Sequence, residues 1–269
     1  MNRPAPIEVL FPELASFAEA DFAKIGTARP TLMMAMTART GSTHLCSGLA
    51  SVLPIGDPTE IFNGRDNLVF EKQNLGIETY GDYLKGFFAQ STGEILFKTN
   101  WLDFQYFEKH LHAMFPNLKI IYLNRFDVEA QAVSVFKAIV TNVWHMTGGA
   151  DDVSKVSVTE TRDQFDLPKI CDLIAVLERE KAAWERFFFE NDLQPTRVHY
   201  EHFQSDLAKV VDQVARHMGF NDVNSALVKS RYRQVSDDLN QEWLKKVRNY
   251  RNGTFYRTYA KKAAMEIPG

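Results

Sequence analysis

The sequence predicts an α/β fold, in which a mainly parallel sheet is flanked by helices. Two short segments, 31–37 and 118–124, are almost uniformly apolar, as strands buried on both faces of a parallel sheet are. A helical pattern follows each of them, and apolar strands alternate with helices along most of the chain. The loop after the first segment contains Gly, Ser and Thr, which is typical of a phosphate-binding connection between a strand and a helix.

The first half of the chain supplies three of the strands. The segment "TLMMAMT" at 31–37 is too short and too apolar for an amphipathic helix, so it is predicted as a strand. The segment "LKIIYLN" at 118–124 is the clearest second buried strand. The other elements expected in this half are helices at 42–53, 81–90 and 104–115 and a strand at 94–100.

The second half is predicted to be mostly helical. Asp127 is placed to cap the N-terminus of a long helix at 127–145. The polar segment 147–164 is predicted to be a mobile loop. The remaining elements are a helix at 166–192 that starts near Pro168, a strand at 196–200, and a helix at 204–220 that ends at Gly219.

Length and composition indicate one globular domain over residues 1–269, with an N-terminal extension (1–29) and a basic C-terminal tail (245–269). The apolar fraction of 45%, the charged fraction of 24% and the net charge of −3 are ordinary and give no sign of nucleic-acid binding. Two distant cysteines, Cys46 and Cys171, form no metal or redox motif. With no signal-peptide core and no apolar run near the ~20 residues that span a bilayer, a cytoplasmic location is expected.

The loop after the first strand, "TARTGSTH", is predicted to bind an anion. A strand–loop–helix junction presents backbone N–H groups and the positive end of the helix dipole. Gly41 allows close backbone approach, Ser42 and Thr43 add hydroxyl donors, and Arg39 adds a planar cation. A loop for nucleoside triphosphates would carry a lysine before its Ser or Thr, and this loop has none. The alternative is a Gly-Ser turn that only caps the helix.

A second anion site is predicted at the end of the strand at 118–124. Arg125 ends that strand and Ser134 follows nine residues later in the next helix. Ligands of open α/β sheets bind at the carboxyl ends of the strands. The alternative is a surface arginine and an ordinary helical serine. Two oxyanion sites at two strand ends suggest a ligand that is phosphorylated at both ends.

Together, "RTGSTHL" and "NRFDVEAQAVS" resemble the sulfotransferases that use 3′-phosphoadenosine 5′-phosphosulfate (PAPS), in particular the bacterial trehalose 2-sulfotransferase type. Further similar stretches occur in the same order and extend the resemblance over most of residues 31–250: "GDPTEIFN", "VHYEHF" and "YRQVSDDLNQEWLKKV". The resemblance implies a P-loop-like sulfotransferase fold that binds PAPS without a metal and releases 3′-phosphoadenosine 5′-phosphate (PAP).

The resemblance also implies roles for individual residues. The first loop would hold the 5′-phosphosulfate, and Arg125 with Ser134 the 3′-phosphate. Glu60, before "IF", matches the proposed general base; its alternative is a solvated loop acid. The remaining candidates are Thr40, His44 and Arg233 for the nucleotide, Lys98 for catalysis together with Arg39, and Asp57 and Trp101 for the acceptor. Lys98 could also simply close its strand.

The function expected is transfer of a sulfuryl group from PAPS to a hydroxyl of a carbohydrate or glycolipid acceptor. A small-molecule kinase and a non-catalytic nucleotide-binding protein remain as alternatives. No metal site and no nucleic-acid partner are expected. The protein is expected to form a homodimer. The segment 245–262 has seven basic residues and no acid, so it is either a solvated terminal helix and extension or an electrostatic contact with an anionic membrane or glycan.

Overall fold

The computed structural model describes residues 7–55, 58–64, 68–69, 72–73, 76–91, 93–144, 161–232 and 237–250. The chain divides into two compact units. The first comprises Met1–Phe126 and Glu180–Arg231, and the second comprises Asp127–Arg179 and Tyr232–Gly269. That the whole chain acts as one domain stays a prediction.

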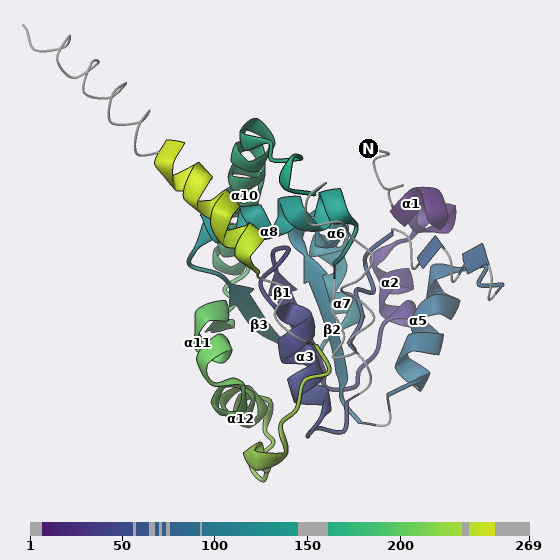
Figure 1. The fold of residues 1–269 in the computed structure, drawn as a ribbon. Helices are drawn as coiled ribbons and strands as arrows, with labels where there is room; N and C mark the ends of the chain where they lie inside the picture. The colour runs from purple at the N-terminus through teal and green to yellow at the C-terminus, as the bar shows by residue number, and fades with distance from the viewer. Residues whose placement is uncertain are drawn as a thin grey trace, which may run out of the picture. The chain divides into compact units, whose positions relative to one another are not determined.

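The first unit is built on a four-stranded parallel sheet, which confirms the predicted fold class (Figure 1). The strand order is β2-β1-β3-β4. Met34 of β1 lies level with Lys98 of β2 and Ile121 of β3, so the carboxyl ends of the three strands meet at one edge. The strands are β1 (Thr31–Met36), β2 (Ile95–Asn100), β3 (Leu118–Asn124) and β4 (Thr196–His199).

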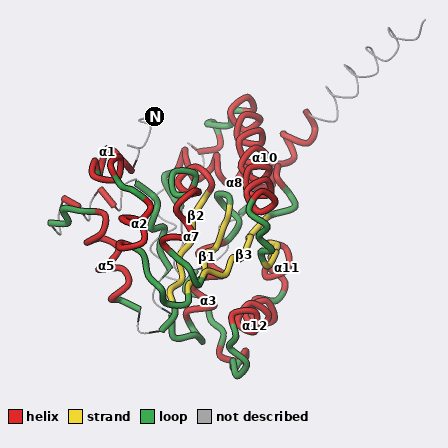
Figure 2. The backbone as a smooth tube through the Cα atoms, turned by 180° about the vertical axis from the view of Figure 1, so that it is seen from behind, coloured by secondary structure: helices red, strands yellow, loops and turns green. Residues whose placement is uncertain are grey.

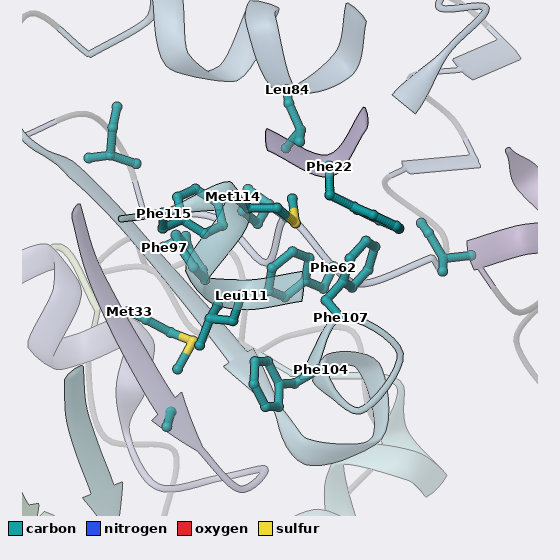
Figure 3. Packing of buried hydrophobic residues seen from close by; sticks show 14 of the residues in the cluster. Phe22, Met33, Phe62, Leu84, Phe97, Phe104, Phe107, Leu111, Met114 and Phe115 are labelled. Atoms are coloured by element: carbon teal, nitrogen blue, oxygen red, sulfur yellow. The ribbon is translucent and has the colours of Figure 1, made fainter. Parts of the chain in front are cut away.

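One face of the sheet packs against an aromatic core. Met33 of β1 and Phe97 of β2 point into this core (Figure 3). Ala35 of β1 and Tyr122 of β3 belong to the same cluster. The carboxyl-terminal part of α10 (Leu167–Glu190) adds Trp184 to it. The other helices that cover this face are α1 (Ile7–Leu10), η1 (Pro12–Ser16), α2 (Glu19–Ile25), α5 (Tyr80–Ala89), α6 (Trp101–Phe104) and α7 (Leu111–Met114).

The opposite face packs against a second, mainly aliphatic core. Leu32, Met34 and Met36 of β1 belong to it, because successive side chains of a strand point to opposite faces. Because both faces of the sheet are covered by a core, the residues that point to either face are apolar, and the strand sequence is almost entirely apolar. The covering helices are α3 (Ser42–Ala50), α11 (Tyr200–Ser205) and α12 (Leu207–Met218), seen from the other side in Figure 2.

Several predicted elements are confirmed with small shifts of their ends. Asp127 caps α8 (Val128–Thr141), accepting a hydrogen bond from the backbone N of Ala130 at 3.0 Å. This helix ends before the predicted residue 145, at Asn142, which adopts a left-handed conformation with φ of 54°. Gly219 ends α12 as predicted, with φ of 100°.

The predicted helix at 104–115 is wrong. Helix α6 ends at Phe104, residues 105–107 form a turn, a 3-10 helix follows at Glu108–His110, and the α-helix α7 covers only Leu111–Met114. Phe104, Phe107, Leu111 and Phe115 are all buried, and His110 stacks on Phe22 with ring centroids 3.8 Å apart. The chain bends to place these side chains in the core, so packing overrides the helical pattern.

Two further segments differ from expectation. The stretch predicted as an N-terminal extension forms α1, η1 and α2 and contributes Phe11 and Phe22, with exposures of 0% and 1%, to the core. Helix α11 was not predicted, although it follows directly on β4. Most of the predicted loop at 147–164 lies outside the described residues.

The second unit contains α8, the first part of α10 and a helix at 238–250. The ring of Trp243 packs against those of Phe136 and Phe165, with centroids 5.5 and 5.9 Å apart. The ion pair between Lys137 and Asp237, at 2.6 Å, joins α8 to the start of the C-terminal helix. Among the described residues, no helix is long and apolar enough to cross a membrane.

Candidate active site

The loop from Thr37 to Gly41 joins β1 to α3 and has a conformation that only glycine fits at its last position. Gly41 has φ of 78°, and a Cβ atom there would lie 2.8 Å from Cζ of Phe203 and 2.9 Å from Cδ2 of Tyr200. The hydroxyl of the buried Thr40 donates to the carbonyl of Thr37 at 3.0 Å. The loop is therefore tightly held at the N-terminus of α3, where the helix dipole favours an anion.

Two arginines that follow different strands, β1 and β3, come together at this loop. Arg39 adopts a left-handed conformation with φ of 62°, which is uncommon for a residue with a side chain. Arg125, which follows β3, donates from Nη1 to the carbonyl oxygen of Arg39 at 3.4 Å. Its guanidinium lies 4.4 Å above the ring of Tyr200, at the start of α11. The structure thus brings the two predicted anion-binding arginines into contact.

The proximity of these cations changes their electrostatics. Burial lowers the pKa of the Arg39 guanidinium, and the positive charge of Arg125 lowers it further. Burial also raises the pKa of Tyr200 above its ordinary value, although the nearby charge of Arg125 opposes this shift. Two like charges held together in a partly buried place repel each other, and an anion bound between them would relieve that repulsion.

Lys98 joins the anion loop to a carboxylate. The side chain of Lys98, 7% exposed, lies near the carboxyl end of β2. Its Nζ donates to Oγ1 of Thr43 on α3 at 2.8 Å and lies 3.3 Å from Oε1 of Glu60. Glu60 is brought there because Thr59 pairs with Phe97, and the backbone N of Lys98 donates to the carbonyl of Thr59 at 3.0 Å. Loop, lysine and carboxylate therefore form one connected set.

The other predicted residues have varied surroundings. His44 stacks on Phe203 with ring centroids 6.1 Å apart. Trp101 packs edge-on against Trp184, at 5.1 Å, and so contributes to the aromatic core. Ser134 lies on α8 in the second unit, and its sharing of one anion site with Arg125 stays a prediction.

Asp57 and Arg233 lie outside the described residues, as does most of the basic segment 245–262. The part of that segment that is described belongs to the C-terminal helix. There, Arg248 pairs with Asp127 and Glu129 at 2.7 and 3.0 Å. Its charge is thus partly neutralised within the second unit, and contact of the tail with a membrane stays a prediction.

No group of three or more His, Cys, Asp or Glu side chains that could hold a metal ion occurs in the described part of the chain. The described residues of the candidate site supply cations, hydroxyls and the carboxylate of Glu60. Such a set can bind an anionic group, stabilise charge that develops on it and accept a proton.

Tyr200 is a site residue that the analysis of the sequence missed. It contacts both Gly41 and the guanidinium of Arg125. The stretch "VHYEHF" was noted only as part of the family resemblance. No local pattern marks Tyr200, because its role depends on residues 75 and more positions away in the sequence.

Residues 85–251 match the model of the Stf0 sulphotransferase family. The trehalose 2-sulfotransferase of Mycolicibacterium smegmatis is 30% identical over 129 residues, which cover 48% of this chain and 45% of that protein. The match to this relative thus spans about half the length of each protein.

Among solved structures, the chain is similar to a sulfotransferase from Alicyclobacillus acidocaldarius, with 15% identity and a TM-score of 0.47, over 83% of this chain and 93% of that one. It is also similar to retinol dehydratase in complex with retinol and PAP, with 15% identity and a TM-score of 0.34, over 87% and 68% of the two chains.

Proposed function

This chain belongs to the Stf0 sulphotransferase family, whose model matches more than half of its 269 residues, and we propose that it transfers the sulfuryl group of PAPS to a hydroxyl of a carbohydrate acceptor. The observation that carries this proposal is the connected set at the carboxyl edge of the sheet. Arg39 and Arg125 lie at two strand ends, and Lys98 links the anion loop to Glu60.

The two arginines fit the two charged groups of the donor. In this proposal Arg39, Gly41 and the N-terminus of α3 bind the 5′-phosphosulfate, because backbone N–H groups and a guanidinium suit a tetrahedral oxyanion. Arg125 binds the 3′-phosphate, with Ser134 as its expected partner. The mutual repulsion of the arginines is then offset by a ligand with two anionic groups.

The reaction is an in-line displacement at sulfur. Glu60 accepts the proton of the acceptor hydroxyl while the acceptor oxygen forms a bond to sulfur. The bond between sulfur and the 5′-phosphate oxygen breaks, and PAP leaves with the electron pair. Lys98, within reach of both Thr43 and Glu60, stabilises charge on the transferring sulfonate. Positioning and electrostatic stabilisation are the main demands of such transfers.

The acceptor is proposed to be a sugar hydroxyl because of the similarity to trehalose 2-sulfotransferase, with trehalose as the first compound to test. Trp101 and Asp57 are proposed to contact it. The experiment incubates the protein with PAPS labelled with ³⁵S, first with trehalose and then with polar and lipid extracts of the host cell. Transfer of label to a sugar or glycolipid supports the proposal.

Calorimetric titration with PAP, ATP and ADP provides the parallel test of the donor. Tighter binding of PAP than of ATP is expected, since the two anion sites match phosphates at the 3′ and 5′ positions. Tighter binding of ATP in the presence of Mg²⁺, with no transfer of sulfate label, would favour the kinase instead. Binding of PAP without transfer to any acceptor would favour a nucleotide-binding protein.

A further inference from the structure

The carboxylate of Glu60 is carried on a turn whose middle is buried. The backbone N of Asn63 donates to the carbonyl of Glu60 at 3.0 Å, which closes the turn. Its two central residues, Ile61 and Phe62, are 0% and 1% exposed and belong to the aromatic core (Figure 3). The hydroxyl of Tyr80 also donates to the carbonyl of Ile61 at 2.9 Å. The backbone that carries Glu60 is thus fixed by packing.

Each oxygen of the Glu60 carboxylate has a separate donor. Lys98 Nζ lies 3.3 Å from Oε1, and the side-chain amide of Asn63 donates to Oε2 at 2.8 Å. Lys98 is itself held by Thr43. A carboxylate has about four lone-pair positions, so two donors on different oxygens fix its plane and leave positions for a further donor.

From this arrangement, and resting on the proposed function, we propose that Asn63 is a positioning residue that orients the Glu60 carboxylate toward the acceptor hydroxyl. A general base works only within about 2.6–3.2 Å of the proton that it removes. The Glu60 side chain is 26% exposed, so its packing alone leaves room for rotation about the last side-chain bond. The bond from Asn63 removes this freedom.

An amide suits this position better than a second cation would. The Asn63 side chain can donate to a carboxylate but does not exchange protons with it. A lysine or arginine in its place would add a second positive charge beside Lys98 and would draw the carboxylate into a closed ion pair. The neutral donor orients the base and leaves it able to accept a proton from the acceptor.

The test compares Asn63→Ala and Asn63→Asp with wild type and with Glu60→Gln. Asn63→Ala removes the donor, and we expect kcat to fall about 10- to 100-fold, because a small misplacement of a reacting group can cost ~100-fold. The KM for the acceptor and the affinity for PAP should change less than about twofold, since Asn63 contacts neither in this proposal. Asn63→Asp has nearly the same shape but cannot donate when ionised, so its loss should be at least as large.

A double variant distinguishes action through Glu60 from any other role. If Asn63 acts through Glu60, adding Asn63→Ala to Glu60→Gln causes no further loss of kcat. A further loss of the same size as in wild type would overturn the proposal, as would a rise in the acceptor KM at unchanged kcat, which would mean that Asn63 binds the acceptor. Thermal unfolding shows whether Asn63→Ala is folded. If it is not, the comparison is made with Asn63→Asp instead.

Failure of this inference and failure of the proposed function give different results. If Glu60→Gln has a low rate while both Asn63 variants keep the wild-type kcat, Glu60 is the base and Asn63 does not position it. If Glu60→Gln itself keeps the wild-type rate, the base is misassigned and the role of Asn63 falls with it.

Discussion

Replacing Arg125 with alanine should remove the preference of the protein for a nucleotide with two phosphates. The guanidinium of Arg125 is held over Tyr200 at 4.4 Å and bonded to the carbonyl of Arg39 at 3.4 Å, so it is positioned before any ligand binds. Loss of one charge-assisted hydrogen bond costs about 1.5–3 kcal/mol, which corresponds to a roughly 10- to 100-fold weaker affinity. Arg125→Ala should therefore remove only the part of the binding free energy that comes from the 3′-phosphate.

The assay is calorimetric titration of wild type and variants with PAP and with AMP, which lacks the 3′-phosphate. In Arg125→Ala the dissociation constant for PAP should rise toward that for AMP, while that for AMP changes little. Arg39→Ala is the matched control, because it should weaken both nucleotides and leave their ratio nearly unchanged.

A preference for PAP over AMP that survives in Arg125→Ala would refute the placement of the 3′-phosphate. Thermal unfolding of the variant provides the check on folding. Loss of the cation–π contact with Tyr200 should cost only about 0.5–1 kcal/mol of stability. A much larger loss would mean that Arg125 holds the fold rather than the ligand.

Three other predictions concern the loop, the thiols and metals. Gly41→Ala should weaken PAP binding and lower the free energy of unfolding, measured in urea, by about 2–4 kcal/mol. Of this, ~1–2 kcal/mol comes from the left-handed backbone conformation and the rest from the clash of the new Cβ with Tyr200 and Phe203. An unchanged urea midpoint would mean that the loop does not require glycine at this position. Burial raises the pKa of Cys46 to about 12, so a thiol reagent at pH 8 should modify only the exposed Cys171 until the protein unfolds. Because the unfolded thiol ionises near pH 9, the contribution of Cys46 to stability is present below that pH and is lost as the pH rises toward 12, which urea titrations across this range would detect. Transfer should persist in EDTA, and its loss in EDTA with recovery in Mg²⁺ would favour the kinase.

The strands and the loop between β1 and α3 could be predicted because their signals are local. Every residue of β1 after Thr31 is apolar because both faces of the sheet are covered, and the loop that follows it contains Arg39 and Gly41 within a few residues. The position of Arg125 directly after β3 is predictable for the same reason, while its role in binding the ligand stays a prediction. Such patterns depend on neighbours along the chain.

The contacts that make these residues a site could not be predicted in the same way. Glu60 and Lys98 are 38 positions apart, and only the pairing of Thr59 with Phe97 brings them together. Tyr200 reaches Arg125 through the arrangement of β4 and α11 beside β3. The prediction of a helix at 104–115 is wrong for a similar reason, because burial of the aromatic residues in this segment outweighs their helix propensity.

The rate of sulfuryl transfer by Glu60→Gln shows whether Glu60 is the general base. Transfer of label from PAPS to the acceptor is measured for wild type, Glu60→Gln and Asp57→Asn, with PAP affinity determined in parallel. We expect the maximal rate to fall about 10²–10⁴-fold in Glu60→Gln at unchanged PAP affinity, with a smaller effect in Asp57→Asn. A wild-type rate in Glu60→Gln, or a larger loss in Asp57→Asn, would mean that Glu60 is not the general base.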